Sequence, residues 1–318
     1  MKIRKLGSTG IEVSEIAFGG VEIGIPYGIG VKDRTDMLSE KDAIRLLRTA
    51  VDEGINFFDT ARLYGESERI MGNAFKDRRD EIVLCSKCTH IKDGEGRIAP
   101  YPALKKTIEN SLHESLKMLQ TDTLDVFMLH QADLEILEND FVSQIVNDLK
   151  TKGMIRATGV SVYVPDETKK AIDTGTWDVI QLPFNLMDQR QKNHFELASQ
   201  KGIAIVVRSV LMKGLLSDRG KNLHPELKLV EEFIQNYNQL LSPNANDLPS
   251  LATKFALSFD AVAAVLVGID KLDYLVQSLL TAHGKPLDRQ TVQKANQLFY
   301  PEPDFLNLAT WSKKGWLV

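Results

Sequence analysis

Four side chains of the types used in acid–base chemistry stand at or just beyond the ends of apolar runs. Asp59 ends "INFFD", Lys87 ends "IVLCSK" and His130 ends "DVFMLH", while Tyr64 lies in the segment that follows Asp59. A free tyrosine has a pKa of about 10, too high to exchange protons freely at neutral pH. An ammonium about 4 Å away favours the phenolate by roughly 4 kcal/mol at an effective dielectric constant of about 20. We therefore expect Lys87 to lower the pKa of Tyr64 toward the working range.

The other two side chains would support this proton donor. Lys87 would lose its charge if it were buried alone, and Asp59 is the counter-ion expected to keep it protonated. His130 would orient and polarise a substrate carbonyl group while Tyr64 gives it a proton. Each residue also has an ordinary alternative, as a helix cap, a wall residue, a solvated cation or a satisfied histidine. All four together at the ends of successive strands favour a catalytic site.

The chain that must position these residues alternates short β-branched or aromatic runs with longer stretches of helical period, which is typical of parallel strands joined by helices. The expected strands are 15–20, 56–61, 82–87, 125–130, 157–162, 179–184, 204–209 and 264–268. Such units in 318 residues predict one α/β domain over residues 1–318, a (β/α)8 TIM barrel, whose usual size is about 250 residues. Active sites of such barrels lie at the C-terminal ends of the strands. Because adjacent strands are about 4.8 Å apart, the four polar side chains are expected to converge there.

The residues beyond a minimal barrel have predictable places. The start, "MKIRKLGSTGIEVSE", predicts an N-terminal β-hairpin, residues 88–102 and 212–247 are expected to form long loops at the C-terminal face, and 288–300 predicts an added helix. A doubly wound sheet is the alternative architecture, but it would show G-x-G-x-x-G after the first strand. The segment "FGGVEIG" lacks that spacing, which favours the barrel.

Bulk properties narrow the class of function. With 39 basic and 43 acidic residues, a nucleic-acid partner is not expected. No apolar run approaches the length of about 18 residues that spans a membrane, and no apolar signal core follows the basic start, so we expect a cytoplasmic protein with no membrane partner.

In a strand, Cys85 and Cys88 would lie about 10 Å apart on opposite faces, and we expect reduced thiols. Six histidines without an H-x-H motif give no support to a metal site.

In its motifs the chain closely resembles the aldo-keto reductases over nearly its full length. The segments that carry the likeness, in the family's order, are "LGSTGIEVSEIAFGG", "GINFFDTARLYGESE", "LCSK", "DVFMLHQAD", "GVSVY", "IQLPFN", "RSVLMKGLLS" and "VLVGIDKLDYLVQSL". The resemblance implies a catalytic tetrad of Asp59, Tyr64, Lys87 and His130, with Tyr64 as general acid/base and hydride from a nicotinamide dinucleotide extended across the barrel mouth. It also implies cofactor contacts from Ser161, Gln181, Arg208, Ser209, Leu211, Gly214, Gly268, Asp270 and Gln277.

Two departures from the family concern the nicotinamide. Where members commonly have Ser-Asn to hold the carboxamide, this chain has Ser161 and Val162, so one polar contact is missing and Gln181 must suffice with Ser161. Arg208 stands where many members stack an aromatic side chain, although some branches resemble this chain in having Arg-Ser. A planar guanidinium can stack as well.

A third departure concerns the choice of cofactor. Asp270 stands where many members place a basic or hydroxyl residue near the adenosine 2′-phosphate, and Tyr274 replaces the family's usual arginine. The resemblance implies NADP(H), but Asp270 keeps NAD(H) open, since a carboxylate repels a phosphate and accepts a hydrogen bond from a free 2′-hydroxyl. Lys271 and Lys213 are candidates to compensate for it. As an ordinary alternative, Asp270 would cap the following helix.

The expected function is an NAD(P)(H)-dependent oxidoreductase that interconverts a small aldehyde or ketone, a sugar among the candidates, and its alcohol. The alternative is a cofactor-binding regulatory or partner subunit of the same fold with little turnover. The sequence leaves the substrate, the reaction direction and the oligomeric state open. Specificity is expected from the long loops, from 21–27 and from Trp311 and Trp316, which are equally suited to pack against the barrel wall.

Overall fold

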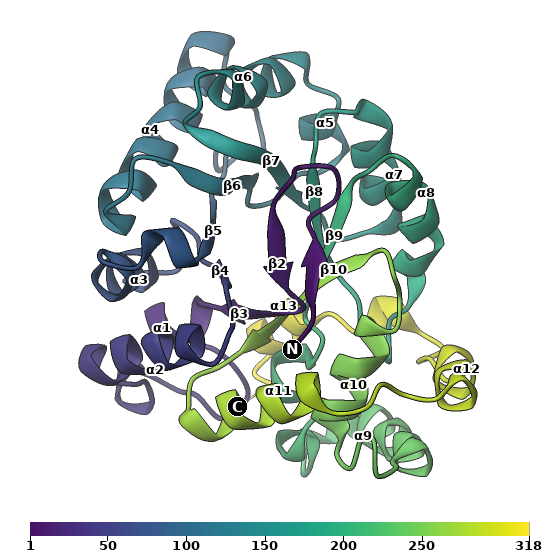
Figure 1. The fold of residues 1–318 in the computed structure, drawn as a ribbon. Coiled ribbons are helices and arrows are strands. Elements are labelled where there is room, and N and C mark those ends of the chain that lie inside the picture. The colour runs from purple at the N-terminus through teal and green to yellow at the C-terminus, as the bar shows by residue number, and fades with distance from the viewer. Residues whose placement is uncertain (318) are drawn as a thin grey trace.

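The fold is a closed barrel surrounded by helices. The computed structural model describes residues 1–317, and within them eight parallel strands close in the order β10-β3-β4-β5-β6-β7-β8-β9 (Figure 1). These strands are β3 (Ile16–Gly19), β4 (Phe57–Asp59), β5 (Val83–Lys87), β6 (Leu124–Leu129), β7 (Ile155–Ser161), β8 (Val179–Pro183), β9 (Ala204–Arg208) and β10 (Val262–Gly268). The predicted (β/α)8 barrel is confirmed, and each expected strand agrees with the observed one to within two residues at either end.

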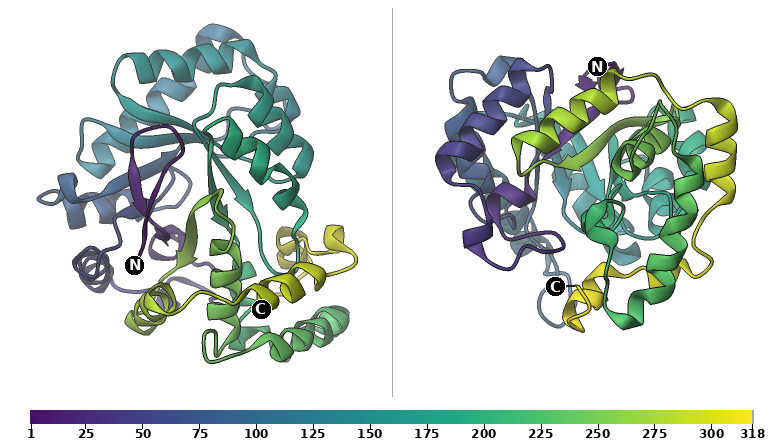
Figure 2. Two further views of the ribbon diagram at one scale, coloured as in Figure 1. Left: turned by 45° about the vertical axis from the view of Figure 1, so that its right-hand side comes forward. Right: turned by 90° about the horizontal axis from the view of Figure 1, so that it is seen from below.

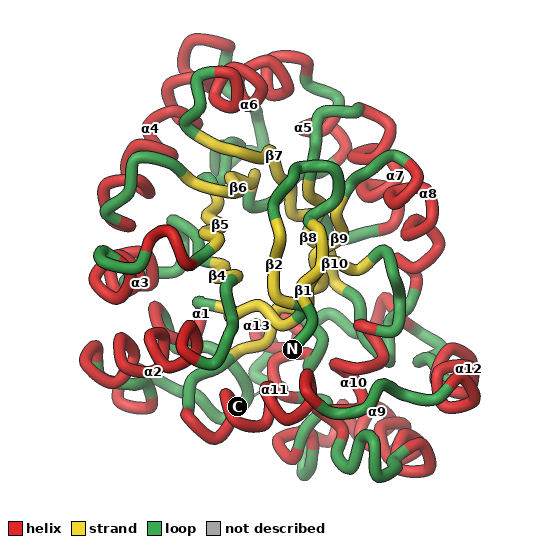
Figure 3. Tube along the Cα trace, viewed as in Figure 1, coloured by secondary structure: helices red, strands yellow, loops and turns green. Residues whose placement is uncertain are grey.

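The helices pack around the outside of the barrel, so that in Figure 3 the strands occupy the centre and the helices the periphery. They are α1 (Val21–Gly24), α2 (Glu40–Asp52), α3 (Ser67–Phe75), α4 (Tyr101–Leu119), α5 (Leu134–Leu137), α6 (Asp140–Thr151), α7 (Pro165–Thr174), α8 (Phe195–Gln200), α9 (Lys228–Ile234), α10 (Leu248–Leu257), α11 (Leu272–His283), α12 (Arg289–Gln297) and α13 (Leu308–Lys313). The predicted added helix is α12. Helix α2 illustrates how the sequence fixes their ends: Ser39 caps it by accepting a hydrogen bond from Asp42 N, and Gly54 just beyond its end adopts the left-handed conformation, φ 91°.

Alternate residues of each strand contribute to two apolar layers. In β6, Val126 and Met128 belong to the cluster inside the barrel, whereas Phe127 belongs to the layer between the sheet and the helices. The same alternation separates the two cysteines, with Cys85 inside and Cys88 outside. Both are buried free thiols, which confirms the prediction that they are not joined.

An N-terminal hairpin closes one end of the barrel. Its strands, β1 (Ile3–Lys5) and β2 (Glu12–Ser14), pair antiparallel. Ser8 N donates to Gly202 O over 2.8 Å, and Leu6 joins the inner apolar cluster. The right-hand view in Figure 2 places the N-terminus and the C-terminal segment at opposite ends of the molecule. The hairpin therefore leaves the end formed by the C-terminal ends of the strands free for a site.

No helix within residues 1–317 is both long enough and apolar enough to traverse a lipid bilayer.

Candidate active site

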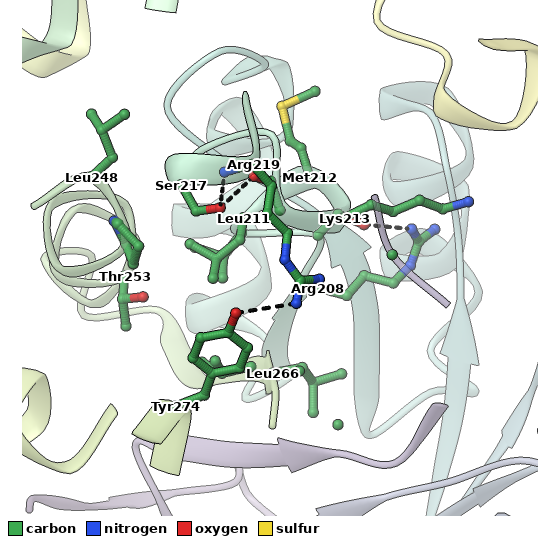
Figure 4. Close-up of a pocket in the computed structure, with 18 of the residues that line it drawn as sticks. Arg208, Leu211, Met212, Lys213, Ser217, Arg219, Leu248, Thr253, Leu266 and Tyr274 are labelled. Carbon is green, nitrogen blue, oxygen red and sulfur yellow. Dashed lines mark hydrogen bonds between the residues drawn. The ribbon is translucent and has the colours of Figure 1, made fainter. Parts of the chain in front are cut away.

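A cavity of about 720 Å³ lies at the C-terminal ends of the barrel strands. Asp59, Tyr64 and His130 line one part of it, and residues of α10 and α11, among them Thr253 and Thr281, line another. Figure 4 shows part of its wall, with Tyr274 on one side and the loop after β9 on the other. The cavity therefore connects Tyr64, the predicted proton donor, with side chains of α10 and α11.

Lys87 and Asp59 form a buried ion pair, and Asp59 lines the cavity. They end the adjacent strands β5 and β4, and Lys87 Nζ lies 2.5 Å from Asp59 Oδ2. The ammonium also donates to Thr60 O over 3.0 Å, and Gln181 Nε2 donates to Asp59 Oδ1 over 2.8 Å. Burial alone would lower the pKa of Lys87, but the Asp59 carboxylate outweighs it and holds that pKa above its ordinary value. Asp59 therefore lies where the sequence predicted a counter-ion for Lys87.

Tyr64 lies over this pair, in the loop between β4 and α3. The Lys87 ammonium is 4.8 Å from the centre of its ring. Burial raises the pKa of Tyr64 above its ordinary value, and Lys87 opposes that rise without cancelling it. The prediction of a lowered pKa was therefore wrong, because the cost of ionising a phenol away from water outweighs the attraction of the phenolate to Lys87. Tyr64 is consequently a neutral phenol at physiological pH and keeps its proton.

His130 follows β6 and meets Tyr64 edge to face, with 5.3 Å between the ring centres. Burial, together with the positive charge of Lys87, lowers the pKa of His130 to about 3. Its Nδ1 is buried without a hydrogen-bond partner among the described residues. A neutral imidazole carries one N–H donor and one acceptor nitrogen, so His130 can donate a hydrogen bond without competing for the proton of Tyr64.

The residues predicted to contact a cofactor border the same cavity. They are Ser161, Gln181, Arg208, Ser209, Leu211, Gly214, Gly268, Asp270 and Gln277. The Arg208 guanidinium stacks over the Tyr163 ring at 4.1 Å and donates to Val162 O over 3.0 Å. It therefore presents a fixed planar cation to the cavity.

The comparisons with known proteins agree with this architecture. The family model of the aldo/keto reductase family matches residues 15–298. The chain belongs to this family. Members interconvert carbonyl compounds and alcohols, so the protein is an oxidoreductase of that type.

Individual aldo/keto reductase relatives cover much of the chain. An L-galactose dehydrogenase from Arabidopsis thaliana is 26% identical and covers 95% of this chain and 95% of its own. An NADH-specific methylglyoxal reductase from Escherichia coli is 29% identical over 68% of this chain and 69% of its own. Among solved structures, the holo form of aldo-keto reductase AKR11C1 from Bacillus halodurans superposes with a TM-score of 0.77 at 28% identity, covering 93% of this chain and 96% of that one.

Within this aldo/keto reductase, the loop after β9 contributes a cation that sequence reasoning missed. Arg219, in the 3-10 helix η5 (Asp218–Gly220), donates to Ile29 O over 3.3 Å and to the Tyr274 hydroxyl over 3.1 Å. The latter bond crosses the gap between the two walls in Figure 4. The sequence shows that the long loop expected at the mouth of the barrel contains basic residues. It does not show which of them points into the cavity.

Glu22 is a second residue whose position the sequence did not reveal. It is in the short helix α1 directly after β3 and lines the cavity. Burial, with smaller contributions from Asp270 and Asp59, raises the pKa of Glu22 to about 8. The only feature of the sequence that could have indicated Glu22 is its place two residues after the glycine pair of "FGGVEIG", at the end of a barrel strand.

The structure decides two open alternatives. Helix α11 has Lys271, not Asp270, at its N-cap position, so the helix-cap alternative for Asp270 was wrong and its carboxylate borders the cavity instead. Trp311 is 1% exposed and packs against Phe305, with 5.5 Å between ring centres, while Trp316 stacks on His224. Both tryptophans therefore pack against neighbouring aromatic rings rather than lining the mouth.

Within residues 1–317, no three His, Cys, Asp or Glu side chains are grouped so as to hold a metal ion.

Proposed function

We propose that this protein is an NAD(P)(H)-dependent oxidoreductase that interconverts a small aldehyde or ketone and its alcohol, with Tyr64 as general acid/base. The observation that carries the proposal is the arrangement of three groups at one end of the cavity. Tyr64 is a neutral phenol, a charged Lys87 lies 4.8 Å from its ring, and a neutral His130 ring lies 5.3 Å away. This is the set of groups that carbonyl protonation needs.

The residues around the cavity fit a nicotinamide dinucleotide. Arg208 at the end of β9, with Lys213 and Arg219 in the loop after it, gives this wall of the cavity a positive charge, which suits a pyrophosphate. The cavity continues from Tyr64 to the polar side chains of α10 and α11, so one ligand can reach both regions. When bound, the reduced dinucleotide supplies a hydride to the carbonyl carbon.

The residues of the chain supply the other half of the reaction. His130 donates a hydrogen bond to the carbonyl oxygen, and the hydroxyl group of Tyr64 transfers its proton to that oxygen as negative charge develops there. The Lys87 ammonium stabilises the phenolate that remains, and Asp59 keeps this ammonium charged. In the direction of alcohol oxidation, the same phenolate accepts the proton.

For the cofactor, we propose that both NADP(H) and NAD(H) bind and that any preference for NADPH is weaker than several hundredfold. Asp270 borders the cavity, and its charge disfavours a 2′-phosphate. Arg219 and Lys271 lie over the Tyr274 ring at 5.6 and 5.8 Å, and these cations offset the carboxylate. The name of the Escherichia coli relative, an NADH-specific reductase, shows that NADH use occurs among proteins similar to this one.

For the substrate, we propose a small carbonyl compound or a sugar. The names of the two relatives, a methylglyoxal reductase and an L-galactose dehydrogenase, support this class. Methylglyoxal and galactose both carry an oxygen atom on the carbon next to the carbonyl group, so we expect short α-oxygenated aldehydes among the substrates.

A panel of aldehydes, ketones and aldoses tests the proposal. Each compound is offered with NADH and with NADPH, and oxidation of the cofactor is followed by its absorbance. We expect turnover of short α-oxygenated aldehydes with both cofactors. Tight cofactor binding without turnover of any compound would instead indicate a cofactor-sensing partner subunit.

A further inference from the structure

Glu22 lies against the paired ends of two barrel strands. Gly268 at the end of β10 pairs with Gly19 at the end of β3, and a Cβ atom at position 268 would lie only 2.1 Å from Glu22 Oε1. The carboxyl group therefore rests on the backbone of Gly268. Its other oxygen, Oε2, is buried and has no hydrogen-bond partner among the described residues. An ionised carboxylate is costly in such a place.

The ionisable groups that face Glu22 come from several elements. Asp270, after β10, and Asp59, at the end of β4, add negative charge, while Arg219 of η5 adds positive charge. Tyr27, in the segment after α1, lies close enough for an ionised Glu22 to raise the pKa of its phenol, which burial already raises. Two carboxylates and one cation thus surround the Glu22 carboxyl group, and they favour its neutral form.

We propose that Glu22 couples dinucleotide binding to the uptake of one proton: its neutral carboxyl group admits the pyrophosphate anion and its ionised form repels it. The inference rests on the proposed function, because the cofactor supplies the anion. When the ligand binds to the ionised protein, one solvent proton forms an O–H bond with a Glu22 carboxylate oxygen, and no other bond is made or broken. Since burial raises the pKa of Glu22 to about 8, the coupling takes effect at mildly alkaline pH.

The expected consequence is a loss of affinity as pH rises. One group that must be protonated for binding weakens the affinity by up to about tenfold per pH unit above its pKa. Lys213 is the principal competing explanation. It borders the same cavity, and burial lowers its pKa, so the loss of its positive charge would also weaken anion binding. The test must therefore distinguish a carboxyl group from an amine.

The experiment measures the Kd of NADH by fluorescence titration between about pH 6.5 and about pH 9.5 for the wild type, Glu22→Gln and Asp218→Asn. Glutamine keeps the shape of the neutral acid but cannot ionise. Asp218 provides the matched control, since its carboxylate borders the same cavity with the side chain 98% exposed. A second readout is proton uptake during NADH binding, obtained by calorimetry in buffers that differ in ionisation enthalpy.

We expect the affinity of the wild type and of Asp218→Asn to weaken about 30-fold across this range and that of Glu22→Gln to change less than about twofold. Equal weakening in Glu22→Gln would overturn the proposal and assign the titration to another group such as Lys213. A pH-independent wild type would overturn it as well. If Glu22→Gln does not fold, proton uptake near pH 8.5 that persists in Lys213→Met supports the proposal, and uptake that is absent from the wild type or lost in Lys213→Met overturns it. Failure of both NADH and NADPH to bind near pH 6.5 would overturn the proposed function and this inference together.

Discussion

The ammonium of Lys87 lies 2.5 Å from the carboxylate of Asp59, and both side chains are almost completely buried, at 0% and 3% exposure. Two charges removed from water in this way stabilise each other but depend on each other. The pair therefore has a structural role, the satisfaction of two buried charges, and a chemical one, the placement of a positive charge beneath the Tyr64 ring.

These two roles can be separated by substitution. Lys87→Met leaves the Asp59 carboxylate buried and unpaired, so we expect it to lower the free energy of unfolding by about 3–5 kcal/mol. The double variant Asp59→Asn/Lys87→Met removes both charges, and we expect it to recover most of that stability. Urea unfolding followed by circular dichroism measures both values.

The activity of the double variant then reports on the chemistry alone. Without the ammonium, the phenolate of Tyr64 loses its stabilising charge, and we expect kcat to stay at least about 100-fold below the wild type although the protein is folded. A stable double variant with near wild-type kcat would show that the pair serves only the fold.

The pH dependence of turnover follows from the shifted pKa values of Tyr64 and His130. The pKa of Tyr64 is raised and that of His130 is lowered to about 3, so both groups keep their neutral forms between about pH 6 and about pH 8. We expect kcat for carbonyl reduction at saturating cofactor to change less than about twofold over this range. Alcohol oxidation needs the phenolate, and its kcat should rise with pH by up to about tenfold per unit.

The pH dependence is checked by measuring kcat for carbonyl reduction and for alcohol oxidation at saturating substrate and cofactor. A reduction rate that falls with an apparent pKa near neutrality would contradict the neutral-phenol assignment, since it would mean that the donor loses its proton far below the value that burial imposes.

The contribution of Asp270 to cofactor choice can be measured directly. Asp270→Ser removes a negative charge from the cavity wall, so we expect the Kd of NADPH to fall by about tenfold relative to that of NADH. Asp273→Ser is the matched control, because Asp273 is an exposed residue in the first turn of α11. Equal changes for both cofactors in Asp270→Ser would show that this carboxylate does not face the 2′ position.

The barrel could be predicted because its strands are apolar on both faces and are separated by helices with clear end signals. In β6 even Phe127 and Val126, which point to opposite layers, are both buried, so the strand reads as a continuous apolar run. The polar residue that ends such a run must lie at the mouth of the barrel. This reasoning located Asp59, Lys87 and His130 without any coordinates.

The sequence could not show whether burial or the attraction to Lys87 dominates the pKa of Tyr64. It also could not show in which direction the side chains outside the strands point. The pKa of Tyr64 depends on how much water reaches its hydroxyl group, and the expected attraction to Lys87 was outweighed by burial. Arg219 and Glu22 lie in short helical segments with no repeating pattern, so nothing in the sequence showed that they turn into the cavity. Those positions depend on tertiary packing, such as the contact of Glu22 with Gly268.

Turnover of Tyr64→Phe is the most direct test of the central claim that the hydroxyl group of Tyr64 donates the proton. Phenylalanine keeps the ring that lies 4.8 Å from Lys87 Nζ and removes only the hydroxyl group. With a carbonyl compound that the wild type reduces, we predict that kcat falls by at least about 100-fold while the Kd of NADH changes less than about twofold. A kcat within about threefold of the wild type would contradict the account.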